Sequence, residues 1–153
     1  ALLNVALKIG VLVLAVIFYA IYDGRVYLRL DVALLWSVLA LVLAFLLALA
    51  ISFFTSIWGE SVRDIRFALG QLLTIWYLLT PILYPLSQVP DAYRGWMFLN
   101  PLAIIVETFK WGLFGVGQFY PEAFALMTFA VAMLLVAGLN YFSRSEARTI
   151  AQR

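Results

Sequence analysis

Few side chains in this sequence have the chemistry to carry out a reaction. The chain contains no histidine and no cysteine, which removes the commonest general base, thiol nucleophiles, disulfides and thiolate metal sites. Four acidic residues stand at the edges of apolar runs, where carboxylates usually cap helices or face the interface: Asp23, Asp31, Asp91 and Glu122. Paired carboxylates, a phosphate loop and metal-ligand spacing are all missing. We therefore predict no catalytic residue, no cofactor and no metal ion on this chain.

One pair of ionisable residues does lie within an apolar segment. Glu107 and Lys110 are three positions apart, so they share one face of a helix. Because charges at membrane depth are costly, such residues usually pair with each other or line a hydrated path. The pair fits a gate, and it fits equally well an interfacial ion pair at the mouth of a hairpin.

Aromatic residues form the richer signal, and four of them are candidates for a substrate path: Trp76, Tyr77, Tyr84 and Trp96. Flat rings with a polar tip suit the C–H faces and hydroxyl edges of a sugar that must slide without binding tightly. Tryptophan and tyrosine also gather at bilayer interfaces for reasons unrelated to any substrate. Both interpretations stay open for each residue.

The composition requires lipid around these residues. Hydrophobic residues make up 66% of the chain and charged residues 12%, with a mean hydropathy of +1.04. A soluble domain carries about 45–50% apolar and about 25% charged residues. The net charge of +2 is too small and too scattered for a nucleic-acid surface. We therefore expect one membrane domain over residues 1–153.

Four nearly uncharged runs approach the length of about 20 residues that a helix needs to cross the hydrocarbon. They are residues 3–22, 32–58, 67–84 and 123–143. The third run ends at Pro81 and Pro85, and Pro121 and Glu122 precede the fourth. The sequence thus predicts an all-α membrane protein with four transmembrane helices.

A further segment, residues about 90–117, contains two apolar pieces too short to cross alone. The pair Asn100-Pro101 supplies a capping side chain and a first-turn proline, so one helix should end near Leu99 and another begin at Pro101. We predict a re-entrant helical hairpin between the third and fourth spans. An amphipathic pair lying flat on the outer surface is the alternative.

Basic residues give the orientation. With both ends in the cytoplasm, six lysines and arginines lie inside (Lys8, Arg63, Arg66, Arg144, Arg148 and Arg153) and four lie outside (Arg25, Arg29, Arg94 and Lys110). The short charged turn between the second and third spans is then cytoplasmic, and its candidate contact residues are Glu60, Arg63, Asp64 and Arg66. This turn fits a contact with a soluble partner, and it fits equally a solvated loop that only enforces topology.

Several short motifs follow one another across about fifty residues. They are Val62-Arg63-Asp64-Ile65-Arg66, Leu79-Thr80-Pro81-Ile82-Leu83-Tyr84-Pro85, Val89-Pro90, Leu99-Asn100-Pro101-Leu102, Glu107, and Lys110-Trp111-Gly112-Leu113-Phe114-Gly115. In this order and spacing they resemble the C-terminal signature of ABC transporter permeases of the polysaccharide and O-antigen export family. The resemblance covers the later part of a family member, with four of its six spans.

The resemblance implies a permease homodimer in the bacterial inner membrane, joined by two cytoplasmic ATPase subunits that would hold ATP and Mg. It implies a periplasmic gate in the hairpin, with six candidate residues: Pro81, Pro85, Asn100, Pro101, Glu107 and Lys110. The family's substrates include lipid-linked O-antigen, capsular polysaccharide and teichoic acid, and the sequence does not choose among them. A type-2 ABC exporter of drugs or lipids and a non-transporting membrane anchor are the competing interpretations.

The topology leads to a labelling prediction. In this cysteine-free chain, Ser61→Cys and Gln88→Cys should react with a membrane-impermeant thiol reagent from opposite sides, because the third span separates them. Labelling in intact cells should modify only the second variant. Modification of both from the periplasm would contradict the orientation.

Overall fold

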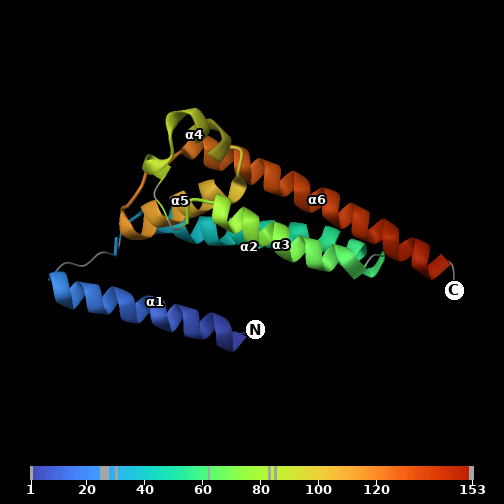
Figure 1. Ribbon diagram of the computed structural model, residues 1–153, viewed down its shortest axis with the longest axis horizontal. Helices are drawn as coiled ribbons and strands as arrows, with labels where there is room; N and C mark the ends of the chain where they lie inside the picture. Colours follow the sequence, from blue (N-terminus) through green and yellow to red (C-terminus); the bar gives the residue numbers. More distant parts are fainter. Residues whose placement is uncertain are drawn as a thin grey trace.

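The structure, a computed structural model, describes residues 2–24, 28–29, 31–61, 63–82, 84 and 86–151. In chain order its elements are α1 (Leu2–Asp23), α2 (Leu34–Ser61), α3 (Arg63–Leu79), the 3-10 turn η1 (Leu86–Gln88), α4 (Asp91–Met97), α5 (Pro101–Phe114) and α6 (Pro121–Ala151) (Figure 1). The described residues contain no strand. The prediction of an all-α protein is therefore confirmed.

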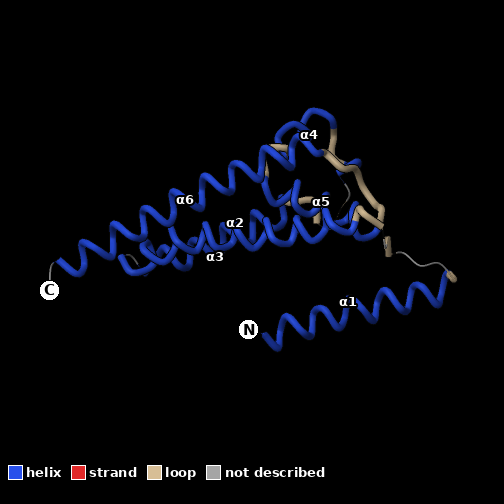
Figure 2. Tube along the Cα trace, turned by 180° about the vertical axis from the view of Figure 1, so that it is seen from behind, coloured by secondary structure: helices blue, strands red, loops and turns tan. Residues whose placement is uncertain are grey.

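Helix α2 is the platform of the bundle, since α3, α5 and α6 all pack against it. Its buried positions recur every three or four residues and, with Ala33 just before the helix, form one stripe: Ala33, Ser37, Ala40, Leu43, Leu47 and Ala50. The core joins this stripe to Ile104 and Ile105 of α5 and to Phe124, Met127 and Val131 of α6. Helices α2, α3 and α6 run side by side, with α4 and α5 at one end and α1 set apart (Figures 1 and 2).

Small residues let the helix backbones approach closely. A Cβ added at Gly112 of α5 would lie 2.4 Å from Ser37 Oγ and 2.6 Å from the Ala33 carbonyl oxygen of α2. The Ser37 hydroxyl uses this proximity to donate to the Phe109 carbonyl at 3.0 Å. Gly138 of α6 likewise lies against α2, at Phe53. Such contacts drive helix association in lipid, where burial of apolar side chains offers no gain over contact with lipid tails.

Two helical stretches are long and apolar enough to cross a membrane, Leu34–Ser56 and Pro121–Arg144. The helices at the first and third predicted spans have shorter apolar stretches, Gly10–Asp23 and Phe67–Leu79. Helices α4 and α5 form a pair bent by 97° that would otherwise pass as one span. These spans were sought only among the described residues. The number of four spans therefore stays a prediction.

Two boundaries differ from those expected. Helix α3 ends at Leu79 rather than near Tyr84, because a proline at position 81 disfavours helical backbone at Thr80 and has no N–H to donate. The charged turn is also much shorter than expected, since α2 continues to Ser61 and α3 begins at Arg63. The break at Asn100-Pro101 is where the sequence predicts it, between α4 and α5.

The close packing of α5 on α2 can be tested with two glycine variants of the complete protein. Gly112→Ala should lower the free energy of unfolding by about 1–3 kcal/mol, because its methyl group would collide with two backbone groups and a hydroxyl of α2. Gly70→Ala is the matched control: nothing lies within 4 Å of its added Cβ, so it should be neutral or stabilise α3 by up to about 1 kcal/mol. Unfolding of both purified proteins in detergent measures the difference, and equal midpoints would contradict the packing.

Candidate functional site

The Asn100 side chain joins the end of α3 to the start of α5. Its Oδ1 accepts from the Trp76 indole Nε1 at 2.9 Å and from the Leu102 amide at 3.1 Å, which makes Asn100 the N-cap of α5. Its Nδ2 donates to Thr80 Oγ1 at 3.1 Å, and that hydroxyl donates to the Trp76 carbonyl at 2.8 Å. The Asn100 side-chain amide thus forms hydrogen bonds with groups at the end of α3 and at the start of α5.

A buried ion pair lies two to three turns further along α5. Glu107 and Lys110 are paired, and their side chains are only 2% and 22% exposed. Lys110 Nζ also donates to the Pro81 carbonyl at 3.1 Å. Glu107 Oε2 packs against Gly117, where φ is 90° and an added Cβ would come within 2.6 Å of that oxygen. Only glycine combines this backbone conformation with so close an approach.

The two sets of contacts form a single feature, because Thr80 and Pro81 are neighbours in the chain. We call the five residues Trp76, Thr80, Pro81, Asn100 and Lys110 the α3–α5 clamp. Thr80 and Pro81 are among the largest fully buried residues. The clamp holds the C-terminal end of α3 on α5, whereas the rest of α3 contacts the bundle mainly at α2. A movement of α3 along its axis would therefore act directly on α5.

A second polar group lies just before α2. The Arg29 amide donates to the Leu113 carbonyl at 2.9 Å, and its guanidinium lies 5.2 Å from the centre of the Trp111 ring. Arg29 also donates to Asp31 Oδ2 at 2.8 Å, and the Ala33 amide donates to Oδ1 at 2.8 Å.

These two hydrogen bonds, the one from Arg29 first, hold the pKa of the Asp31 carboxyl below its ordinary value. Whatever stability they add is complete above the ordinary pKa and is lost as the pH falls through the lowered value. The Asp31 carboxylate therefore holds the Arg29 side chain and the Ala33 amide throughout the neutral range.

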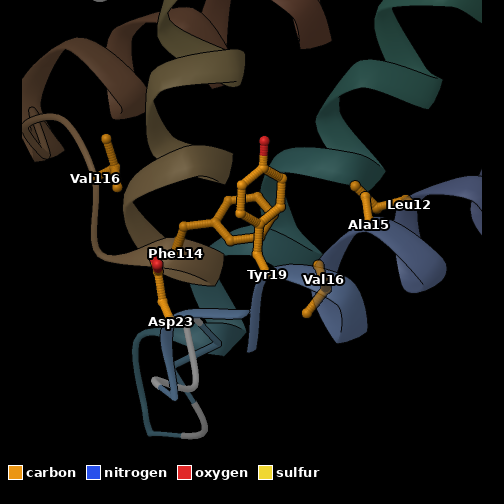
Figure 3. A pocket seen from close by; sticks show the side chains of 7 residues that line it. All are labelled: Leu12, Ala15, Val16, Tyr19, Asp23, Phe114 and Val116. Atoms are coloured by element: carbon orange, nitrogen blue, oxygen red, sulfur yellow. The ribbon is translucent and has the colours of Figure 1, made fainter. Parts of the chain in front are cut away.

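An open pocket of about 450 Å³ separates α1 from the end of α5. Figure 3 shows Tyr19 of α1 and Phe114 of α5 pointing into it, with Leu12, Val16 and Val116 around them. Its walls are apolar apart from Tyr19 and Asp23. Such walls suit a lipid chain or another apolar helix better than a hydroxylated ligand.

Comparisons with known proteins identify the family. Residues 2–114, most of the chain, match the family described as ABC-2 type transporter. The chain belongs to this family. It is also 32% identical over 107 residues to the O-antigen export system permease protein RfbA of Myxococcus xanthus, a match that covers 64% of this chain and 39% of that relative. The chain thus spans about two fifths of the length of that relative. No solved structure matches.

This ABC-2 family chain brings together some of the predicted site residues. Pro81, Asn100 and Lys110 belong to the clamp, and Glu107 pairs with Lys110. Pro101 is the first residue of α5, next to the Asn100 cap. Trp76 joins them through its indole N–H instead of standing free. The remaining gate candidate, Pro85, lies outside the described residues.

The other aromatic candidates lie apart from one another. Tyr77 and Trp96 are exposed, at 44% and 71%. Tyr84 is half-buried and donates to the Leu79 carbonyl at 3.1 Å. Within the described part of the chain, no hydrogen bond, ion pair or ring contact joins these three residues to Trp76.

The four coupling candidates meet at the α2–α3 junction. Glu60 is in the last turn of α2, and Arg63, Asp64 and Arg66 are in the first turn of α3. The structure describes their backbone alone.

Sequence reasoning missed several residues of the site. Thr80 was visible only as part of the Leu79-Thr80-Pro81 motif, and its role depends on Asn100, twenty positions away. Trp36, Trp111 and Phe119 form a cluster, with ring centres 4.6 Å apart for Trp36 and Phe119 and 4.7 Å for Trp111 and Phe119. In the sequence, this cluster could have been suspected from the aromatic residues Phe119 and Tyr120 before Pro121 and from the tryptophan after Lys110.

The two ion pairs with the same spacing provide a matched test. Lys110→Met should lower the free energy of unfolding by about 3–5 kcal/mol, because it leaves Glu107 buried and unpaired. Adding Glu107→Gln should recover part of that loss. Asp91→Asn, at the exposed pair with Arg94 on α4, should cost under about 1 kcal/mol. Thermal unfolding in detergent measures all three, and equal losses at both pairs would contradict the burial of Glu107.

Proposed function

We propose that this chain is part of the membrane-spanning permease of an ATP-driven exporter that moves polysaccharide or lipid-linked glycan across the bacterial inner membrane. The observation that carries the proposal is the similarity to an O-antigen export permease within the ABC-2 type family. Because the chain spans about two fifths of that relative, the activity belongs to a complete permease that contains this segment.

The partners of the proposed exporter are a second copy of the permease and two cytoplasmic ABC ATPase subunits, which hold ATP and Mg. Membership of the ABC-2 family supports an ATPase partner. The residues with ionisable side chains at the α2–α3 junction support its place of contact: Glu60, Arg63, Asp64 and Arg66. In this proposal both ends of the chain are cytoplasmic, and the clamp and the bent pair face the periplasm.

The bent pair of α4 and α5 is the proposed periplasmic gate. Six of its α5 residues are buried, among them Glu107 and Thr108, and α5 packs against both α2 and α6. This burial favours a re-entrant hairpin over a pair lying flat on the surface, where one face of α5 would be open. The clamp would then transmit a movement of α3, driven by the ATPase at Arg63 and Asp64, to the gate.

The exposed aromatic residues Tyr77 and Trp96 are the proposed contacts along the substrate path, with Tyr84 between them in the chain. Their rings can slide along a sugar without fixing it. Trp76 has a different proposed role. Its indole N–H donates to the Asn100 cap, so Trp76 positions the gate, and the substrate contacts are left to Tyr77, Tyr84 and Trp96.

Reconstitution tests the function. The complete permease and its ATPase in liposomes should move undecaprenyl-linked glycan in an ATP-dependent manner. Arg63→Ala with Asp64→Ala should lower this export about fivefold or more by weakening the coupling between ATPase and permease. Gln71→Ala, on an exposed face of the same helix α3, is the control and should leave export unchanged.

Other outcomes separate the competing functions. ATP-dependent movement of a drug or a free phospholipid without movement of glycan would make the complex a type-2 exporter of those compounds. A stable complex with the ATPase that transports none of the three would make the chain an anchor. Either result overturns the proposed function.

A further inference from the structure

A pocket of about 320 Å³ lies at the start of α6, and its lining includes none of the aromatic residues that the sequence singles out as a substrate path. Its lining residues come from the end of α4, the α5–α6 connection and the first turn of α6: Phe98, Phe119, Tyr120, Pro121, Glu122 and Ala123. This volume is at the lower end of the range of about 300–1,000 Å³ for small-ligand pockets. The site therefore suits a single small ring.

Two aromatic walls of the pocket are held in place by other rings. Phe119 stacks on Trp111, with planes 15° apart, and leans against Trp36. Phe98 and Tyr120 meet edge to face, with ring centres 4.9 Å apart. These contacts fix the rings before any ligand arrives, so binding would order few side chains.

The third wall is polar and negative. Glu122 is exposed in the first turn of α6, where the helix dipole favours a charged carboxylate. No hydrogen bond or ion pair of Glu122 occurs among the residues that the structure describes. Its two oxygens are therefore available to accept hydrogen bonds, beside rings that offer an apolar face.

We propose that this pocket binds one neutral pyranose ring of the exported glycan, an inference that rests on the proposed function. The C–H face of the sugar packs on Tyr120 and Phe98, and its hydroxyls donate to the Glu122 carboxylate. A phosphate is excluded because the lining holds a carboxylate and no cation. An acyl chain has no hydroxyl to donate to that carboxylate, so it would use the aromatic walls alone.

The position of the pocket gives it a place in export. It lies beside the proposed gate, because Phe98 is the C-cap of α4. In addition, Phe119 contacts Trp36, which packs against the core that contains Ile104 and Ile105 of α5. Its ring cluster also continues through Trp111 to the end of α5. A sugar bound there would be held at the outer mouth, after the gate and before release.

Binding of methyl glycosides tests the pocket directly. The probes are the methyl glycosides of glucose, galactose and mannose, with the complete permease in nanodiscs that contain no glycolipid and saturation-transfer NMR as the readout. Ala123→Leu fills the pocket and should abolish the ring-proton signal of the glycoside that binds. Ala125→Leu is the matched control, an exposed site on the same helix outside the pocket, and should keep it.

Glu122→Gln supplies a second variant that does not depend on core packing, since this side chain is exposed. It should weaken binding about fivefold, because a charged acceptor becomes a neutral one. Glycerol 3-phosphate, the anionic control, should give no signal with any variant. No glycoside signal from the parent protein, or equal signals from the parent, Ala123→Leu and Glu122→Gln, would overturn the pocket.

Export in liposomes separates this inference from the proposed function. If the parent complex moves glycan and Ala123→Leu lowers the rate severalfold below Ala125→Leu, the pocket acts on the exported sugar. If the parent moves glycan and the two leucine variants move it equally, the pocket has no part in export and only this inference fails. If the parent moves no glycan, the proposed function itself fails, and the pocket proposal falls with it.

Discussion

Where a helix ends inside an apolar bundle, its free carbonyl and amide groups need hydrogen-bond partners. The arrangement of this structure depends on which side chains supply those partners. Helix α3 ends at Leu79 and α5 begins at Pro101, so both leave polar groups away from regular helix bonds. Asn100 caps α5 and donates a hydrogen bond to Thr80, while Lys110 donates to the Pro81 carbonyl. The clamp is the solution to this constraint. It also joins the end of α3 to both Asn100 and Lys110 of the α5 segment.

The clamp in turn depends on how closely α5 approaches α2. Gly112 and the Ser37 hydroxyl bring the two helices together, and this places Glu107 in the interior. A buried carboxylate is tolerable only with a partner, which Lys110 supplies one turn later. The ion pair is thus a consequence of helix packing. Its burial favours α5 inside the bundle over α5 lying flat on the surface. The same approach carries Trp111 to the rings at the start of α6.

The polar features of this ABC-2 family chain lie at two ends of the bundle. One end holds the clamp, the ion pair, the Arg29 group and the aromatic pocket. The other holds the charged residues of the α2–α3 junction, and α3 connects the two. Between them, the outward faces of α2, α3 and α6 carry exposed apolar side chains that suit lipid. This separation fits the proposed exporter, in which an ATPase acts on one side of the membrane and the substrate path opens on the other.

The sequence by itself determined the helical class, the break at Asn100-Pro101 and the position of Glu107 and Lys110 on one face of a helix. These features depend on composition, on capping chemistry and on positions one turn apart, all of which are local. The sequence missed two boundaries: α3 ends earlier than expected, and the two helices extend almost to each other at the charged turn. The same local signals allowed a longer third span and a longer loop. Only the tertiary structure decided that Thr80 and Trp76 serve the Asn100 cap and that Phe119 joins Trp36 to Trp111. Those contacts join residues up to 83 positions apart, and no local periodicity encodes which side chains meet when helices pack around α2.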